Sequence, residues 1–409
     1  MQKTLIFLAL LACSSLSAQE VLTFEEAVQR TFCQSPLLHI SNDEIGERAG
    51  ARQQSKRLPN PTAAWSVENV FGNREWQGWE SAESRYEIGQ LIELGGKRSY
   101  RSNAATYQLF AAQAGYAAQK TMVLNRLSKA FAEVAGLQEQ VKLADEQAKI
   151  ADEVYKTVSA KLEAGRISLI QQNKAEIALW TARISYNAAV TDFAKAKERL
   201  SAFWGCSCPD FNEVDYWFYE LAAPESLEEC FCTLENNPEL LRSHFEYLSS
   251  QQNLNLERAG SVPDVTVAVG YKTLRETGNK GMILGASIPI PIFNQNQGNI
   301  QKARFESQKM QDQFQNLQLV LKNRLSAAYR DLIRAYREAE QLKTSVLKNA
   351  TQSFDLASEG YKEGKFEYLD VLDSQRTLFD VRGRYIQTLV NYHKSMADIK
   401  YLNSQSEIL

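Results

Sequence analysis

Hydrophobic residues in the last third of the chain follow a helical period over an unusual length. From Gly298 to Lys362, some 65 residues contain no proline. Apolar side chains recur there at steps of three and four, at Phe314, Leu317, Leu321, Leu325, Ala328, Leu332, Ala335, Ala339, Leu342 and Val346. This spacing predicts a coiled-coil seam. At about 1.5 Å per residue the helix is about 100 Å long, a length that spans a distance rather than filling a compact core.

The first half shows the same pattern from about residue 97 to 163. Gly115 and Gly136 are positions where the low helix propensity of glycine weakens this helix. Both long helices end at a short glycine turn. We expect Gly165 and Gly364 to take the left-handed conformation that closes a helix. The chain then returns through a second helical pattern, so the sequence predicts two antiparallel hairpins, over 97–203 and 298–401.

Four short segments alternate with period two instead. The clearest places Val265, Val267, Val269 and Tyr271 on one face of a predicted strand over 264–273. The other three predicted strands cover about 62–71, 85–94 and 282–292. Each has about the length of a transmembrane β-strand.

The chain repeats itself at a spacing of about 200 residues. The residues that match at a constant offset of 199 are Leu162, Gly165, Arg183, Tyr186 and Phe193 in the first half and Tyr361, Gly364, Arg382, Tyr385 and Tyr392 in the second. We therefore predict a first repeat over 19–204, a linker over 205–225 and a second repeat over 226–409. Each repeat contains a helix, two strands and a long helical hairpin, a mainly α fold with a small β part.

The first 18 residues have the charged start, apolar run and small residues of a secretory signal peptide. An alternative is a bacterial lipoprotein signal, in which Cys13 becomes acylated. After residue 18, no apolar run approaches the roughly 20 residues of a membrane-spanning helix. Four strands cannot close a membrane barrel alone, so strands placed in a bilayer require several copies of the chain.

Composition argues against two broad classes of function. Lys and Arg number 46 against 49 Asp and Glu, a net charge of -3 that leaves no basic excess for nucleic acid. The 3 His are scattered, and no spacing suggests a nucleophile, a metal site or a cofactor site. We therefore expect neither an enzyme nor a nucleic-acid-binding protein.

Three segments together resemble the TolC family of outer-membrane efflux proteins. They are Gln90-Leu91-Ile92-Glu93-Leu94-Gly95-Gly96-Lys97-Arg98, Ile288-Pro289-Ile290-Pro291-Ile292-Phe293-Asn294, and Tyr368-Leu369-Asp370-Val371-Leu372-Asp373-Ser374-Gln375. The first two are most similar to the branch that serves heavy-metal cation efflux. The resemblance extends over both repeats.

This resemblance implies a homotrimer in the bacterial outer membrane, in contact with outer-membrane lipid. Each chain contributes four strands to a 12-stranded barrel and its helices to a periplasmic tunnel. Such a channel passively exports substrates that an inner-membrane pump, often of the resistance-nodulation-division type, and a periplasmic adaptor deliver. Metal cations and organic compounds both remain open as substrates.

The resemblance also assigns an acidic selectivity ring to Asp370 and Asp373, at the narrow periplasmic entrance. A ring of carboxylates concentrates cations. The alternative is an ordinary solvated helix start, where acids favour the positive end of the helix dipole. The first-repeat counterparts are Gln171 and Lys174, so one hairpin alone supplies the acids.

Tyr361 matches a tyrosine that helps to hold the entrance closed in this family. A basic partner is expected two residues after Gly364, but Phe366 stands there, beside Lys365. Gln171 occupies a position where an acidic partner can occur. These replacements favour an apolar or looser closure. At the other end of the long helices, the transitions from strand to helix are assigned to Gly95, Gly96, Lys97, Pro289 and Pro291.

Cysteine usage leaves alternatives open. Cys206, Cys208, Cys230 and Cys232 form two C-x-C pairs, which suit disulfides or free thiols better than zinc, whose ligands are usually spaced more widely. A secreted coiled-coil scaffold without a pore is the main rival function. It accounts for the heptads but not for two strand pairs at equal positions in both repeats.

Overall fold

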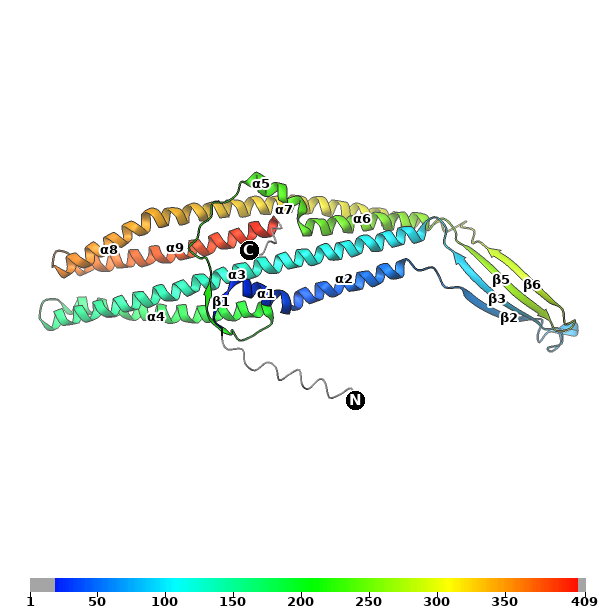
Figure 1. The fold of residues 1–409 in the computed structure, drawn as a ribbon, viewed down its shortest axis with the longest axis horizontal. Helices are drawn as coiled ribbons and strands as arrows, with labels where there is room; N and C mark the ends of the chain where they lie inside the picture. The colour runs from blue at the N-terminus through cyan, green and yellow to red at the C-terminus, as the bar shows by residue number, and fades with distance from the viewer. Residues whose placement is uncertain (1–18, 404–409) are drawn as a thin grey trace, which may run out of the picture. The chain divides into compact units, whose positions relative to one another are not determined.

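The computed structural model describes residues 19–403, so the predicted signal peptide and Cys13 lie outside the described residues. Figure 1 shows the order of the elements. The helices are α1 (Phe24–Gln34), α2 (Pro36–Ser55), α3 (Lys97–Glu163), α4 (Leu169–Ser201), α5 (Leu227–Thr233), α6 (Pro238–Ala259), α7 (Gln297–Gln341), α8 (Leu347–Lys362) and α9 (Tyr368–Leu402). The strands are β1 (Gln19–Thr23), β2 (Thr62–Glu68), β3 (Glu83–Ile92), β4 (Phe211–Asp215), β5 (Val265–Leu274) and β6 (Lys280–Ser287). Among the described residues, no helix is both long and apolar enough to cross a bilayer.

The chain divides into two compact units. The first contains the residues up to Ile40, Ala118–Asn237 and the chain from Val320 onward, whereas the second contains Ser41–Ala117 and Pro238–Leu319. Both repeats contribute to each unit. The fold class is as predicted, mainly helical with duplicated hairpins and four hairpin strands.

The first helix of each repeat begins with the same capping arrangement. The Glu26 N–H donates to the Thr23 hydroxyl (3.3 Å), and the Thr23 N–H donates back to the Glu26 carboxylate (3.2 Å). Ser226 and Glu229 form the same reciprocal pair at the start of α5. This capping box satisfies two amide groups that a helix start leaves free.

The second unit contains an antiparallel sheet in the order β2-β3-β5-β6. The strands pair in a register that places Trp65, Tyr86, Tyr271 and Met282 side by side across the sheet. This face is apolar and exposed, with Met282 79% and Leu284 83% accessible. On the opposite face, Lys272 forms an ion pair with Glu83 at 2.7 Å. Among the described strands, β2 and β6 each pair on one side, so the sheet has two free edges.

The strand ends differ from the predicted ones for local reasons. The strand predicted over 62–71 ends at Glu68, because Asn69 and Phe71 take left-handed backbone conformations, with φ of 59° and 61°. The strand predicted to reach 292 ends at Ser287, just before Pro289, which has no N–H to donate to a partner. The strand predicted over 85–94 runs over Glu83–Ile92, and the one predicted over 264–273 is shifted by one residue.

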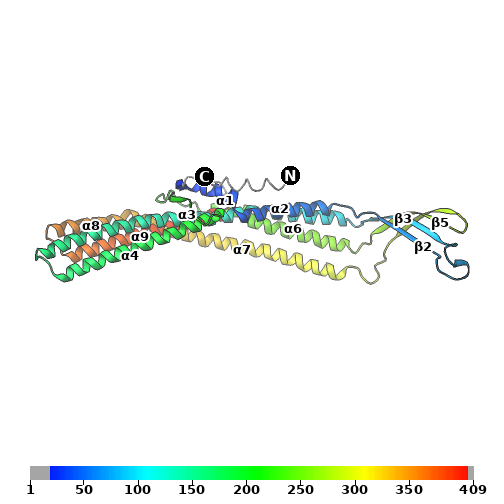
Figure 2. The ribbon, with the colours of Figure 1, turned by 90° about the horizontal axis from the view of Figure 1, so that it is seen from below.

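The first unit packs α3, α4, α8 and α9 alongside one another, as Figures 1 and 2 show. Its core includes the fully buried Leu127, Phe131, Leu200 and Leu389. Gly136, which the sequence predicted as a weak position of the helix, lies within the continuous helix α3. A Cβ atom there would lie 2.2 Å from Val390 Cγ2, so glycine permits the close approach of α3 and α9.

The predicted helix from 298 to 362 contains a change of phase. A π-helical turn over Leu342–Val346 separates α7 from α8. Leu321, Leu325, Leu332, Ala335, Ala339 and Leu342 are buried as the heptad pattern predicts, but Val346 is 41% exposed. The wider turn rotates the following residues, so burial resumes at Ala350 rather than Val346.

The linker contains a strand that the sequence pattern did not reveal. β4 pairs in parallel with β1, with Val21 opposite Glu213. The Gln138 side chain accepts from the Val214 N–H (2.8 Å) and donates to the Val214 carbonyl (3.1 Å). These bonds fix the linker to α3.

Candidate functional site

The residues assigned to the entrance lie at two matching helix turns. Gly364 (φ 79°) closes α8, where its N–H donates to the Tyr361 carbonyl and the Lys365 N–H donates to the Gly360 carbonyl (2.7 Å). Gly165 (φ 71°) closes α3 with the same two bonds, to Leu162 and from Arg166 to Lys161. Both turns are Schellman motifs, in which a left-handed glycine satisfies the last carbonyl groups of a helix.

Tyr361 joins the two hairpins at these turns. The Lys161 ammonium group lies 3.6 Å from the centre of the Tyr361 ring, a cation–π contact between α3 and α8. Tyr361 also lies 5.9 Å from the Tyr368 ring, centre to centre. Together with Leu372, both tyrosines pack on a small core that contains Val158 and Ala175. The contact is apolar and cation–π in character.

The two tyrosine hydroxyls have no hydrogen-bond partner among the described residues, although both oxygens are buried. Burial raises the pKa of the Tyr368 hydroxyl to about 12, and the neighbouring Tyr361 contributes to the shift. Gln171 lies half-exposed in the first turn of α4, with its N–H donating to the Ser168 carbonyl. Lys365 is exposed and pairs with Glu363.

Phe366 has a defined place that motif comparison did not indicate. A Cβ atom on Gly360 would lie 2.1 Å from Phe366 Cδ2, so the ring lies directly on the glycine. The Phe366 N–H also donates to the Gly360 carbonyl (3.3 Å). A glycine inside a helix, six residues before an aromatic residue in a turn, is the sequence signal of this contact.

Asp370 and Asp373 are both exposed in the first turns of α9. Asp370 also stabilises the helix start, because its carboxylate accepts from the Glu367 N–H (3.0 Å). Asp373 makes no ion pair or hydrogen bond with another described residue. One acid therefore caps α9, and the other leaves its charge free.

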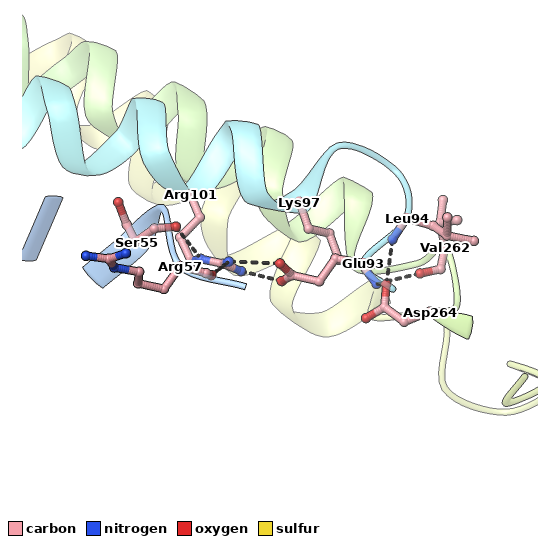
Figure 3. A network of polar contacts seen from close by, with 8 residues as sticks. All are labelled: Ser55, Arg57, Glu93, Leu94, Lys97, Arg101, Val262 and Asp264. Carbon is pink, nitrogen blue, oxygen red and sulfur yellow. Dashed lines mark hydrogen bonds and ion pairs between the residues drawn. The ribbon is translucent and has the colours of Figure 1, made fainter. Parts of the chain in front are cut away.

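The transition from β3 to α3 is a polar network, shown in Figure 3. Gly95 and Gly96 turn the chain with φ of 69° and 76°. Lys97 Nζ then donates to Asp264 Oδ1 (2.7 Å) and to the Val262 carbonyl (2.7 Å). The Leu94 N–H donates to the same Asp264 oxygen (2.9 Å). Lys97 thus connects the first repeat to the second.

Arg101 completes the network with a two-pronged ion pair. Its Nη1 and Nη2 donate to the two oxygens of Glu93 at 2.5 and 2.9 Å. Its Nε donates to the Ser55 carbonyl (3.1 Å), at the end of α2. The hydrogen bond from Arg101 lowers the pKa of Glu93. Burial opposes ionisation of Asp264, yet the bonds from Lys97 and Leu94 lower its pKa.

The second transition uses different chemistry. Pro289 and Pro291 are exposed in the irregular segment after β6. Asn296 then turns the chain into α7 with φ of 63°, and its Nδ2 donates to both the carbonyl and the carboxylate of Glu257, at 2.8 and 2.7 Å. The prolines thus end the strand, and Asn296, which no sequence motif indicated, fixes the turn.

The cysteines do not pair in the structure. Cys33, Cys206, Cys208, Cys230 and Cys232 are all free. Within residues 19–403, no cluster of three or more His, Cys, Asp or Glu side chains is arranged to hold a metal ion.

Comparison with known proteins identifies the family. The outer membrane efflux protein family model matches residues 53–206 and 232–402. The chain is 33% identical over 381 residues to the cobalt-zinc-cadmium resistance protein CzcC of Cupriavidus metallidurans, covering 92% of this chain and 89% of that protein. It is 22% identical to the cation efflux system protein CusC of Escherichia coli K12, covering 75% and 69%.

Solved structures show the same fold. The outer membrane protein VceC of Vibrio cholerae aligns with a TM-score of 0.80 at 16% identity, covering 93% of this chain and 96% of that one. A CusC structure aligns with a TM-score of 0.72 at 15% identity, covering 93% and 91%. The family profile, the CzcC identity and the shared fold agree that this chain belongs to the outer membrane efflux protein family, whose members are channels.

Proposed function

We propose that three copies of this outer-membrane efflux protein form one channel that exports divalent metal cations. An inner-membrane pump supplies the cations, and a periplasmic adaptor joins the pump to the channel. The chain supplies the conduit across the outer membrane and a long periplasmic portion. The pump supplies the energy.

The four-stranded sheet carries the proposal. Its apolar face is suited to lipid, but β2 and β6 leave backbone groups unpaired at both edges. An unpaired backbone group in lipid costs several kcal/mol. Joining β6 of one copy to β2 of the next removes every free edge, and four strands from each of three copies make twelve.

The substrate class rests on two observations. CzcC, which is 33% identical to this chain, is named for resistance to cobalt, zinc and cadmium. In addition, the exposed Asp370 and Asp373 follow the Gly364 turn, and three copies place six carboxylates around one axis. Such a ring attracts cations and raises their local concentration. Tyr361 and Phe366 form the constriction beside it, without a hydrogen-bonded lock.

Zinc export from cells tests this function. A strain that lacks the chain but retains its pump and adaptor should accumulate zinc, and the wild-type chain should restore export. Asp373→Asn should export less zinc, because it removes three ring charges without touching the Asp370 cap. Asp331→Asn, which removes an exposed carboxylate from α7, is the matched control and should behave as wild type. Unchanged zinc content on deletion would refute the cation assignment.

A further inference from the structure

The linker lines a cavity in the first unit. Residues 216–225, between β4 and α5, lie across α9 in Figure 1, and the Tyr392 hydroxyl of α9 contacts Ala222. Together with α1, α3, α7 and α9, they line a volume of about 500 Å³, which we call the linker cavity. All of its lining residues belong to the first unit. Its size is within the range of sites that bind drug-sized molecules.

The linker wall of this cavity is fixed on both sides of Glu220. The Tyr392 hydroxyl donates to the Ala222 carbonyl (2.9 Å) and accepts from the Ala222 N–H (3.0 Å). His393 Nε2 donates to the Phe218 carbonyl at 2.9 Å. Because the chain's own bonds hold this wall in place, little ordering of the wall opposes the binding of a ligand.

Aromatic rings form a continuous part of the lining. The Phe24 and Tyr216 ring centres are 6.2 Å apart, and those of Tyr216 and Trp217 are 6.3 Å apart. Tyr329 of α7 also lines the cavity. Among the described residues, no Lys or Arg makes a cation–π contact with any of these four rings. Their faces therefore attract the charge of a ligand without competition from the chain's own cations.

The charged groups of the lining are mainly acidic. Glu220 and Glu225 are exposed at the cavity, and neither carboxylate has an ion-pair partner within residues 19–403. Lys400 is the single Lys or Arg among the described lining residues. Burial lowers the pKa of His393, so its imidazole is neutral at neutral pH. The lining therefore carries an excess of negative charge.

These features favour an organic cation over other ligands. In the part of the chain that the structure describes, no group of three or more His, Cys, Asp or Glu side chains is placed to hold a metal ion. An anion meets an excess of carboxylates, which repel it. An organic cation instead buries its apolar body against the rings, while its charge interacts with the ring faces and the carboxylates.

We propose that the linker cavity binds a small organic cation, whose apolar body lies against Phe24, Tyr216 and Trp217 and whose charge is balanced by Glu220 and Glu225. The site goes beyond the proposed export of metal cations, because one chain forms it and it needs neither the ring of copies nor the acidic entrance. A bound cation bridges the linker and the helices, so it should also protect the linker from proteolysis.

Isothermal titration calorimetry of the full chain in detergent tests the proposal, with protein-free detergent as the blank. Tetraphenylphosphonium and tetraphenylborate share the same shape and carry opposite charges. The phosphonium should bind saturably and several-fold more tightly than the borate. Glu220→Gln with Glu225→Gln should weaken phosphonium binding several-fold. The matched control Asp373→Asn removes an exposed carboxylate outside the cavity and should leave binding unchanged. Equal affinities for the two ions, or no saturable binding of the phosphonium, would overturn the proposal.

Cleavage by a Glu-specific protease locates the bound cation. Tetraphenylphosphonium should slow cleavage after Glu220 several-fold and leave cleavage after Glu276, exposed in the loop between β5 and β6, unchanged. Trp217→Ala should remove this protection, and intact protection in that variant would contradict the assigned wall. Saturable binding without protection of Glu220 places the cation elsewhere and refutes the proposal. If only a chain ending at Asn403 binds the phosphonium, residues 404–409 occupy the cavity and the proposal is wrong.

Discussion

Removing the Asp264 carboxylate should weaken the junction between strand and helix more than any surface ion pair in the molecule. Asp264 Oδ1 accepts from Lys97 Nζ at 2.7 Å and from the Leu94 N–H at 2.9 Å. In Asp264→Ala, Lys97 retains its bond to the Val262 carbonyl but loses its counter-charge. The Leu94 N–H loses its acceptor. The substitution therefore leaves the Leu94 N–H without an acceptor and the Lys97 ammonium group without its counter-charge.

The burial of the pair sets the size of the effect. The Lys97 and Asp264 side chains are 13% and 22% exposed. Removing one partner of a fully buried pair costs about 3–5 kcal/mol, and an exposed pair is worth about 0–1 kcal/mol. For this partly exposed pair we expect about 2 kcal/mol, which is about 30-fold in the unfolding equilibrium at about 1.4 kcal/mol per factor of ten.

Denaturant unfolding of the full chain in detergent measures this effect. Asp145→Ala is the control, because Asp145 pairs with Lys149 on the same helix where the two side chains are 41% and 73% exposed. The control should change the free energy of unfolding far less than Asp264→Ala, because solvent screens this exposed pair. Equal losses from both variants, or a loss from Asp264→Ala below about 0.5 kcal/mol, the ordinary range for surface substitutions, would refute the reasoning from burial.

Three further substitutions, and the pH dependence of stability, have defined outcomes. Gly360→Ala should displace Phe366, whose Cδ2 lies 2.1 Å from the new Cβ, and should increase the open fraction of single channels; an unchanged open fraction contradicts a role for this contact in closure. Gly136→Ala places a Cβ 2.2 Å from Val390 Cγ2 and should destabilise the protein by about 1–3 kcal/mol in the same unfolding assay, as overpacking does. Burial lowers the pKa of His393, so folding disfavours its protonated form and stability should fall as the pH drops below the ordinary value of 6.5; in His393→Phe, the unfolding midpoint should lose this part of its pH dependence. The lowered pKa of Glu93 also makes stability fall with pH, but in a more acidic range. Its contribution to stability is fully present above the ordinary pKa of 4.5 and is lost as the pH falls through the pKa of the folded state.

The long helices and their turns could be predicted because their causes are local. Heptad spacing decides which face of α7 is buried, and a glycine just past a helix end indicates a left-handed cap. Gly165 and Gly364 both have this conformation. The alternating faces of β5 were equally visible, since a half-buried strand must alternate.

The remaining features depend on partners that are distant in the sequence. β1 pairs with β4 across about 190 residues, and five-residue segments carry too little pattern to reveal such a pair. Lys97 and Asp264 are likewise 167 positions apart. The sequence did not reveal the π turn for another reason. Leu342 and Val346 keep the expected spacing of four, although the extra residue in the turn rotates the helix.

The candidate entrance was located by a motif, but its chemistry came from contacts. The sequence placed Asp370 and Asp373 together without separating their roles. The structure shows that the Asp370 carboxylate caps α9, whereas the Asp373 carboxylate has no hydrogen-bond or ion-pair partner among residues 19–403. The Tyr361 contact to Lys161 required knowing which helices lie side by side.

Planar-bilayer conductance of the purified protein tests the central claim most directly. In a gradient of calcium chloride, wild-type protein should form discrete channels whose reversal potential favours the cation. Asp373→Asn should shift this potential towards zero, while Asp331→Asn should leave it unchanged. Discrete channels with this shift would support both the pore and the acidic ring. Channels with the same selectivity in all three proteins would contradict the ring, and no conductance from folded trimers at any voltage would contradict the channel.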